Sequence, residues 1–212
     1  MTKKLVSLML AILMILTASA ALAKTVEPDA SKPDDTEFDH LAGATVHATV
    51  GEWNEDAKVF TVTLYEDDRF DPEEIDNLAA GDLLLAGGSV YKVKEKTSTE
   101  EYDILVRTED GYEIVFVKVG DDVYVAQSTD DDRRYMHAFA VLYLAPAENL
   151  TYEDYSDPES EEASVTTNLD EILAIKADKE ENSIGFDFYA TMITLNENLE
   201  IELIHQAFDV AQ

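Results

Sequence analysis

The feature that most constrains this chain is a series of short segments in which apolar and polar residues alternate, separated by turn sequences. The most regular stretch extends from Asp82 to Gln127. Its turn sequences are Gly87-Gly88, Asp110-Gly111 and Gly120-Asp121. Alternation with a period of two places successive side chains on opposite faces of a strand, and such glycine-containing pairs are typical of β-hairpin turns. The stretch therefore predicts a meander of consecutive hairpin-linked strands.

Strand patterns also occur on both sides of this stretch. Residues 44–50 and 58–65 predict an antiparallel pair, joined by a hairpin connection at residues 51–56. Residues 184–192 and 199–203 predict a closing hairpin near the C-terminal end. These pairs extend the hairpin pattern over most of the chain.

Two of the predicted strands, at residues 112–117 and 138–144, are apolar on both faces. Strands of this kind are buried on both sides, inside a sandwich or beneath a helix. They favour one compact domain over an open single-layer sheet. We therefore expect a mainly β fold, an antiparallel hairpin-built sandwich or small barrel with two short helices, as a single β-rich domain over residues 44–212.

Both expected helices are marked by their capping residues. Asp71 is a good N-cap, Pro72 stands at the first helical position, and Glu74 completes a capping box. Gly81 is expected to end this helix. A second capping box at residues 168–171 predicts another short helix. A helix as short as the first is not stable alone, so it must pack on the sheet.

The N-terminal segment predicts export. Lys3 and Lys4 precede an apolar run from Leu5 to Ala20, and Ala21-Leu22-Ala23 follows as the small-residue pattern of a signal peptidase site. A charged start, an apolar middle and a small-residue exit identify residues 1–23 as a secretory signal peptide. The run of about 16 apolar residues is shorter than the roughly 20 that a membrane-spanning helix needs, which disfavours the alternative of a retained anchor.

The chain has no cysteine, so it lacks the residue that carries the lipid of a lipoprotein. We expect a secreted or extracytoplasmic protein, in the periplasm or at the cell surface, without a lipid anchor. Residues 24–43, rich in proline and charge, predict a flexible tether. Residues 146–164, rich in acidic residues and serine, predict a long acidic loop.

The chain carries 46 acidic residues against 15 lysines and arginines, a net charge of −31. Nucleic acids and anionic membranes bind positively charged surfaces, so this balance argues against both as partners. Divalent cations, a cationic peptide and envelope carbohydrate remain open as partners. The alternative is that the acidity serves solubility alone.

Three adjacent carboxylates, Asp130, Asp131 and Asp132, are the candidate metal ligands, with Ca²⁺ as the expected ion. They lack the spacing of an EF-hand loop. Successive residues on a strand point to opposite faces, so the three carboxylates converge only if the loop curls. The alternative is a solvated loop tip neutralised by Arg133 and Arg134. We expect no other cofactor.

Trp53 and Tyr65 are the candidate ligand-binding residues, because exposed aromatic rings stack on sugar rings. The alternative is that aromatic residues occur here because strands favour them and pair them across strands. The four histidines lack the spacing of a zinc site, so we expect His137 and His205 to be hydrogen-bonded structural residues.

No catalytic motif stands out. Ser89 follows Gly87-Gly88 but lacks the second glycine of a nucleophile elbow, and a chain without cysteine has no thiol nucleophile. We therefore predict a non-catalytic extracytoplasmic binding or interaction module of unknown ligand. Two alternatives remain open: a small secreted hydrolase that uses paired carboxylates, and a Ca²⁺-associated structural protein. A cleft holding two carboxylates would favour the hydrolase, and a flat face of Tyr and Trp would favour carbohydrate binding.

Overall fold

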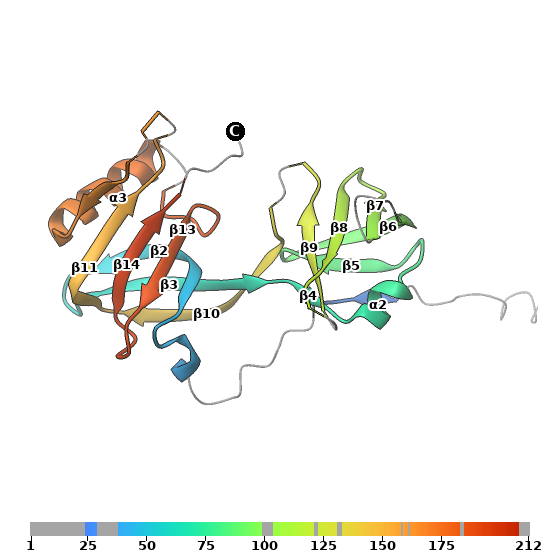
Figure 1. Cartoon of the computed structure of the whole chain (residues 1–212), viewed down its shortest axis with the longest axis horizontal. Helices are drawn as coiled ribbons and strands as arrows, with labels where there is room; N and C mark the ends of the chain where they lie inside the picture. Colours follow the sequence, from blue (N-terminus) through green and yellow to red (C-terminus); the bar gives the residue numbers. More distant parts are fainter. Residues whose placement is uncertain are drawn as a thin grey trace, which may run out of the picture.

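The computed structural model describes residues 24–28, 38–98, 104–120, 123–130, 133–157, 159–160, 162–182 and 185–207. Within these residues the chain forms two seven-stranded sheets, mostly antiparallel, with two α-helices and one 3-10 helix (Figure 1). The predicted mainly β, hairpin-built fold is confirmed, and the described strands form no closed barrel. The predicted signal peptide at residues 1–23 lies outside the described part of the chain.

The first sheet contains the predicted meander. Its strands are β1 (Thr25–Val26), β4 (Arg69–Phe70), β5 (Leu83–Ala86), β6 (Ser89–Thr97), β7 (Ile104–Thr108), β8 (Glu113–Lys118) and β9 (Tyr124–Ser128). They lie in the order β1-β5-β6-β7-β8-β9-β4, and each strand from β5 to β9 pairs antiparallel with the next. Gly87 and Gly88 form the β5–β6 turn with φ angles of 55° and 72°, which glycine adopts without strain.

The second sheet collects strands from the early and late parts of the chain. Its strands are β2 (Thr45–Asn54), β3 (Val59–Asp67), β10 (Met136–Leu144), β11 (Pro146–Asp154), β12 (Ser164–Thr166), β13 (Thr191–Leu195) and β14 (Ile201–Gln206). They lie in the order β10-β3-β2-β13-β14-β11-β12. Neighbouring strands are antiparallel, except that β11 and β14 are parallel.

The strands β4 to β9 of the first sheet are inserted between two neighbouring strands of the second, whereas β1 comes before both strands in the sequence. β3 and β10 pair antiparallel, with Met136 opposite Asp67, and all strands from β4 to β9 lie between them in the sequence. The helix α2 (Pro72–Asp76) belongs to the same inserted segment. The molecule therefore has two lobes side by side (Figure 1), and the inserted segment leaves the second sheet at residues 67–69 and rejoins it at residues 133–136.

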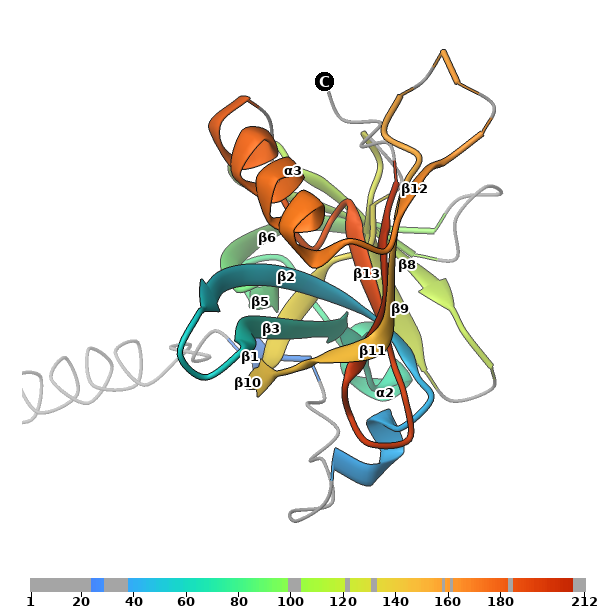
Figure 2. The ribbon, with the colours of Figure 1, turned by 90° about the vertical axis from the view of Figure 1, so that its left-hand side faces the viewer.

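Each lobe has its own hydrophobic core. In the first lobe, Phe70 and Phe116 are buried among the side chains of the meander. In the second lobe, Phe60 and Ile204 belong to a separate buried cluster. The helix α3 (Leu169–Asn182) lies across the second sheet (Figure 2) and adds its residues to this second cluster.

Both predicted N-caps begin helices, but the two helices end differently. The Asp71 carboxylate accepts a hydrogen bond from the Glu73 N–H at 2.7 Å, as an N-cap should. The prediction that Gly81 ends this helix was wrong, because α2 ends one turn earlier. Asn77 closes it by donating its backbone and side-chain N–H groups to the Glu73 carbonyl at 3.1 and 2.8 Å.

The second capping box starts a longer helix. The Asn168 side chain accepts a hydrogen bond from the Asp170 N–H at 3.0 Å, and the helix α3 that follows has 14 residues. Its Ile172 is fully buried against the second sheet. Packing of this face onto the sheet stabilises a helix that would be marginal alone.

The β2–β3 hairpin turns later than predicted. β2 continues to Asn54, and the turn occupies residues 55–58 rather than 51–56. Gly51 lies inside the strand, where a Cβ atom would stand 3.0 Å from the Thr61 carbonyl oxygen. The glycine therefore permits a close approach of two backbones instead of a turn.

The two strands predicted to be buried on both faces differ. In β8, Ile114, Val115 and Phe116 are all buried, so the prediction holds for the centre of the strand. Tyr112 and Val117, at the ends of the predicted strand, are 53% and 36% exposed. In β10, Val141 and Tyr143 are 61% and 74% exposed, so the prediction for residues 138–144 was wrong. An apolar sequence tolerates burial, but the number of layers that cover a strand depends on its place in the sheet.

Residues 146–164, predicted as an acidic loop, begin with the strand β11. Leu150 and Tyr152 are buried in it, whereas acidic neighbours such as Glu148 are exposed. Period-two alternation is therefore present in this segment, although its acidic composition suggests a loop. Of the described residues in this segment, those outside a strand lie between β11 and β12.

The predicted strand at residues 184–192 is shorter in the structure. β13 begins at Thr191, because the preceding residues form a turn closed by a hydrogen bond of 3.0 Å from the Ala190 N–H to the Asp187 carbonyl. The predicted pairing of this strand with the chain's last strand is confirmed, since β13 pairs with β14.

Residues 24–43 are ordered at both ends. β1 pairs parallel with β5, and its Val26 is fully buried in the first core. The 3-10 helix η1 (Phe38–Leu41) supplies Leu41 to the second core. Residues 29–37 lie outside the described ranges, so for them the tether stays a prediction.

Candidate functional site

β10 is the candidate binding element of the molecule, because it is a long strand at the edge of a sheet. It pairs with β3 on one side, from Met136 opposite Asp67 to Leu144 opposite Phe60. No strand of the described chain pairs with its other side. The other sheet edges are short, since β1 and β4 have two residues each and β12 has three. Exposed strand edges carry unpaired N–H and C=O groups, and natural proteins usually keep such edges short or charged.

The side chains of β10 do not protect this edge. The strand contains no Lys, Arg, Asp or Glu. Phe139, Ala140 and Leu142 pack against the second core, which holds the strand in place. Val141 and Tyr143 extend into solvent instead. The edge therefore combines a fixed backbone with exposed apolar side chains, a combination that suits the addition of another strand.

The first residues of β10 lie at the junction between the two lobes. The Asp68 side chain is fully buried there, and its carboxylate accepts a hydrogen bond from the Gly87 N–H at 2.5 Å. The His137 Nδ1 lies 2.7 Å from the Asp68 Oδ1, and the His137 Nε2 lies 3.1 Å from the Glu66 Oε1. A buried carboxylate is stable only with such partners. This cluster ties the β3–β4 link, the β5–β6 turn and β10 together.

The junction cluster bears on the hydrolase alternative. Glu66 and Asp68 are two carboxylates in one place, but the imidazole of His137 lies between them and contacts both. A glycosidase needs its two carboxylates to face the substrate across a cleft. The arrangement therefore fits a structural connection better than an acid–base pair, in line with the hydrogen-bonded role expected for His137.

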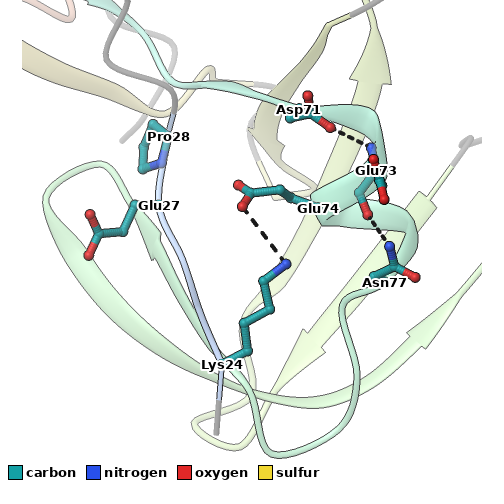
Figure 3. Close-up of a pocket in the computed structure, with 7 residues that line it drawn as sticks. All are labelled: Lys24, Glu27, Pro28, Asp71, Glu73, Glu74 and Asn77. Atoms are coloured by element: carbon teal, nitrogen blue, oxygen red, sulfur yellow. Dashed lines mark hydrogen bonds and ion pairs between the residues drawn. The ribbon is translucent and has the colours of Figure 1, made fainter.

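Two pockets open beside this junction. The smaller, of about 200 Å³, is lined by Glu27, Pro28, Asp68, Leu85, Gly88 and His137. The larger, of about 570 Å³, is lined by Lys24, Glu27, Pro28, Asp71, Glu73, Glu74 and Asn77 (Figure 3). Because Glu27 and Pro28 line both, the two pockets are neighbours.

The larger pocket is acidic. Glu27 comes from the segment after β1, and three further carboxylates come from α2 and its N-cap on the other side of the pocket (Figure 3). The Lys24 ammonium lies 3.8 Å from the Glu74 Oε1. Four carboxylates beside one ammonium group create a negative potential, which attracts a cationic group.

The predicted metal ligands are only partly described. Asp130 is an exposed turn residue whose N–H donates to the Ser128 hydroxyl at 3.2 Å, and Asp131 and Asp132 lie outside the described residues. Among the residues that the structure does describe, no three His, Cys, Asp or Glu side chains are grouped to hold a metal ion. The Ca²⁺ site at Asp130, Asp131 and Asp132 stays a prediction.

The predicted aromatic ligand-binding residues lie apart. The Trp53 ring packs on Phe60 on the core side of the sheet, with a centroid distance of 4.8 Å, and its Nε1–H donates to Glu55 at 2.7 Å. Tyr65 points to the other face, where its ring stacks on Phe188 at 3.9 Å. Since the two rings lie on opposite faces, they do not form one flat platform, and ligand binding by either residue stays a prediction.

Sequence reasoning missed both the free edge and the acidic pocket. The absence of charge in residues 136–144 is a visible signal, and we read it as burial because the sequence does not show which strand lies at an edge. Glu27 and Glu74 are far apart in the sequence, and only the pairing of β1 with β5 brings them to one pocket.

The fold and this site define a class: a mainly β protein of two sheet lobes with a long, uncharged edge strand and an acidic pocket between the β1 segment and α2. No protein-family model matches the chain, and comparisons with curated proteins and with solved structures find no significant match. No helix in the described ranges has the length and apolar content needed to cross a membrane.

Proposed function

We propose that this protein is an extracytoplasmic, non-catalytic interaction module that binds an extended basic polypeptide along the free edge of β10. The single observation that supports this most is the edge itself, nine residues long, uncharged, and paired on one side only within the described residues. Export is supported by the signal-peptide pattern of residues 1–23.

Strand addition explains how such an edge would bind. The main-chain N–H and C=O groups of the incoming segment pair with those of β10 and supply affinity, while alternate side chains supply specificity. Val141 and Tyr143 provide apolar contact area beside the new strand. Because β10 is anchored on the second core, its backbone is already ordered, which lowers the entropic cost of binding.

The charge of the chain selects a basic partner. A net charge of −31 attracts a cationic segment and repels an acidic one, including a second copy of this chain. The acidic pocket adjoins the smaller pocket that His137 lines, so it lies near the first residues of β10. A lysine or arginine of the bound segment would place its cationic group there.

The test measures peptide binding by fluorescence anisotropy. A labelled nine-residue peptide of alternating Lys and Val should bind, and a matched peptide of alternating Glu and Val should not. The substitution Val141→Lys places a like charge on the edge and should weaken binding of the Lys-Val peptide about tenfold or more. Val165→Lys, at a similarly exposed valine on the short edge strand β12, is the matched control and should bind as the unsubstituted protein does.

Two results would contradict the proposal. Equal binding by the Val141→Lys and Val165→Lys variants would show that β10 is not the docking strand. A protein that is dimeric in solution, and becomes monomeric on Val141→Lys substitution, would show that the edge pairs with a second copy instead.

A further inference from the structure

We infer that this protein has a binding site for its own N-terminal amine: the carboxylate of Asp82 holds the α-ammonium group of Lys24 that signal-peptide removal creates. The inference rests on the export that is part of the proposed function, since cleavage after Ala23 makes Lys24 the first residue. It concerns the stability of the first lobe and does not depend on what β10 binds.

The backbone nitrogen of Lys24 already has an anionic partner. It donates a hydrogen bond to the Asp82 Oδ1 at 3.0 Å. The other oxygen of the same carboxylate accepts from the Ala79 N–H at 2.9 Å, which fixes the orientation of the group. The Lys24 carbonyl in turn accepts from the Leu83 N–H at 2.8 Å. The first residue after the predicted cleavage site is therefore bound through its backbone at both ends.

The contact between Lys24 and Asp82 lies next to β1, the two-residue strand at the edge of the first sheet. β1 begins at Thr25, directly after Lys24, and pairs with β5 through two residues only. Val26 is nevertheless fully buried in the first core. A two-residue strand has few hydrogen bonds of its own, so the contact between Lys24 and Asp82 adds to the burial of Val26 in holding β1 at the edge.

Cleavage places a positive charge on the Lys24 side of this contact. Water adds across the Ala23–Lys24 peptide bond, which leaves a carboxylate on Ala23 and an amine on Lys24 that takes up a proton at neutral pH. One neutral N–H donor thus becomes a charged group with three donors. The bond to Asp82 is already charge-assisted through its carboxylate acceptor, and after cleavage the donor is charged as well, which adds a direct attraction between opposite charges. Capture of an N-terminal amine is a recurrent form of recognition in proteins.

The experiment is a double-mutant cycle on residues 24–212, a form that contains every described residue. One sample begins with a free Lys24 amine, and the other carries an Nα-acetyl group, which keeps the N–H donor and removes the charge. Both samples are made with Asp82 and with the substitution Asp82→Asn. Acetylation should lower the melting temperature of the Asp82 protein by about 2–4 °C and that of the Asp82→Asn protein by less than about 1 °C.

A second measurement examines the pairing of β1 with β5 directly, apart from the stability of the whole protein. Hydrogen exchange at the Leu83 amide, which bonds the Lys24 carbonyl, should be about fivefold faster in the acetylated Asp82 protein. Equal effects of acetylation in both backgrounds would overturn the amine site and leave the peptide-binding function standing. Protein isolated from its source cells with residues 1–23 still attached would overturn both the amine site and the proposed export.

Discussion

Asp154 illustrates how one partly buried carboxyl is kept in its charged form. Its carboxylate accepts hydrogen bonds from the Ser156 N–H at 2.8 Å and the Tyr152 hydroxyl at 2.9 Å, and it lies 3.0 Å from the Lys179 Nζ. Burial acts to raise the pKa of Asp154, but the hydrogen bonds from Ser156, then those from Lys179 and Tyr152, outweigh it and lower this pKa below its usual value. The cluster connects β11 to α3.

The substitution Asp154→Asn should therefore have a pH-dependent effect. A folded-state pKa below the unfolded value of about 3.9 means that ionised Asp154 stabilises the fold above that pH and that the stabilisation is lost as pH falls through the folded-state pKa. At pH 7 we expect the variant to be less stable by about 1–2 kcal/mol, and the difference should shrink below about pH 4. Urea unfolding at several pH values measures this.

Asp56→Asn, at an exposed turn carboxyl, is the control and should change stability little at any of these pH values. A loss in the Asp154→Asn protein that stays the same from pH 7 to pH 3 would show that Asp154 acts by its shape and not by its charge.

The β5–β6 turn shows how an element depends on its surroundings. Gly87 and Gly88 both have positive φ angles, which suits the tight turn. Their environments differ, because a Cβ atom on Gly87 would lie 2.9 Å from the Tyr135 ring, whereas one on Gly88 would meet nothing within 4 Å. The Gly87 N–H also bonds the buried Asp68 carboxylate. Gly87 therefore serves both the turn and the junction between the lobes.

This difference predicts unequal effects of alanine at the two positions. Gly88→Ala should lose about 1 kcal/mol of unfolding free energy, from backbone strain alone. Gly87→Ala should lose at least about 1 kcal/mol more, because the Tyr135 ring must also move. Chemical denaturation of the two variants compares them directly. Equal losses would mean that the Tyr135 ring yields without cost.

At the scale of the whole molecule, the two lobes have separate cores joined at the Asp68 cluster. The cluster contains groups from the β3–β4 link, the β5–β6 turn and β10, so it sets how the inserted lobe meets the rest of the chain. The same junction carries the start of β10 and the smaller pocket, which adjoins the acidic pocket through Glu27 and Pro28. The proposed binding site therefore depends on the arrangement of the lobes as well as on the strands within each.

Separate cores predict separate local stabilities. Phe116→Ala removes a fully buried ring from the first core and should cost about 3–5 kcal/mol. Hydrogen exchange should become faster in β5 to β9 while the amides of β13 and β14 stay protected. Phe60→Ala, in the second core, should give the reverse pattern. Exchange that becomes equally fast in both lobes of the Phe116→Ala protein would show that they unfold as one unit.

The sequence by itself determined the features that depend on interactions between residues close together in the chain. The strands of the meander, the Gly87-Gly88 turn and the N-caps Asp71 and Asn168 were all predictable. Each depends on local physics: side chains alternate along a strand, glycine tolerates positive φ, and a short polar side chain bonds the next free N–H group.

Only the tertiary structure decided which strands meet and which are covered. Part of the predicted acidic loop at residues 146–164 is a strand, β11, because it pairs parallel with β14. β10 lies at an edge because of the strand order of the second sheet. The site follows the same logic, since Glu27, Asp68 and His137 meet because strands far apart in the sequence pair and because one lobe is inserted into the other. Burial and proximity are properties of contacts between distant segments, and a local pattern of residues does not contain them.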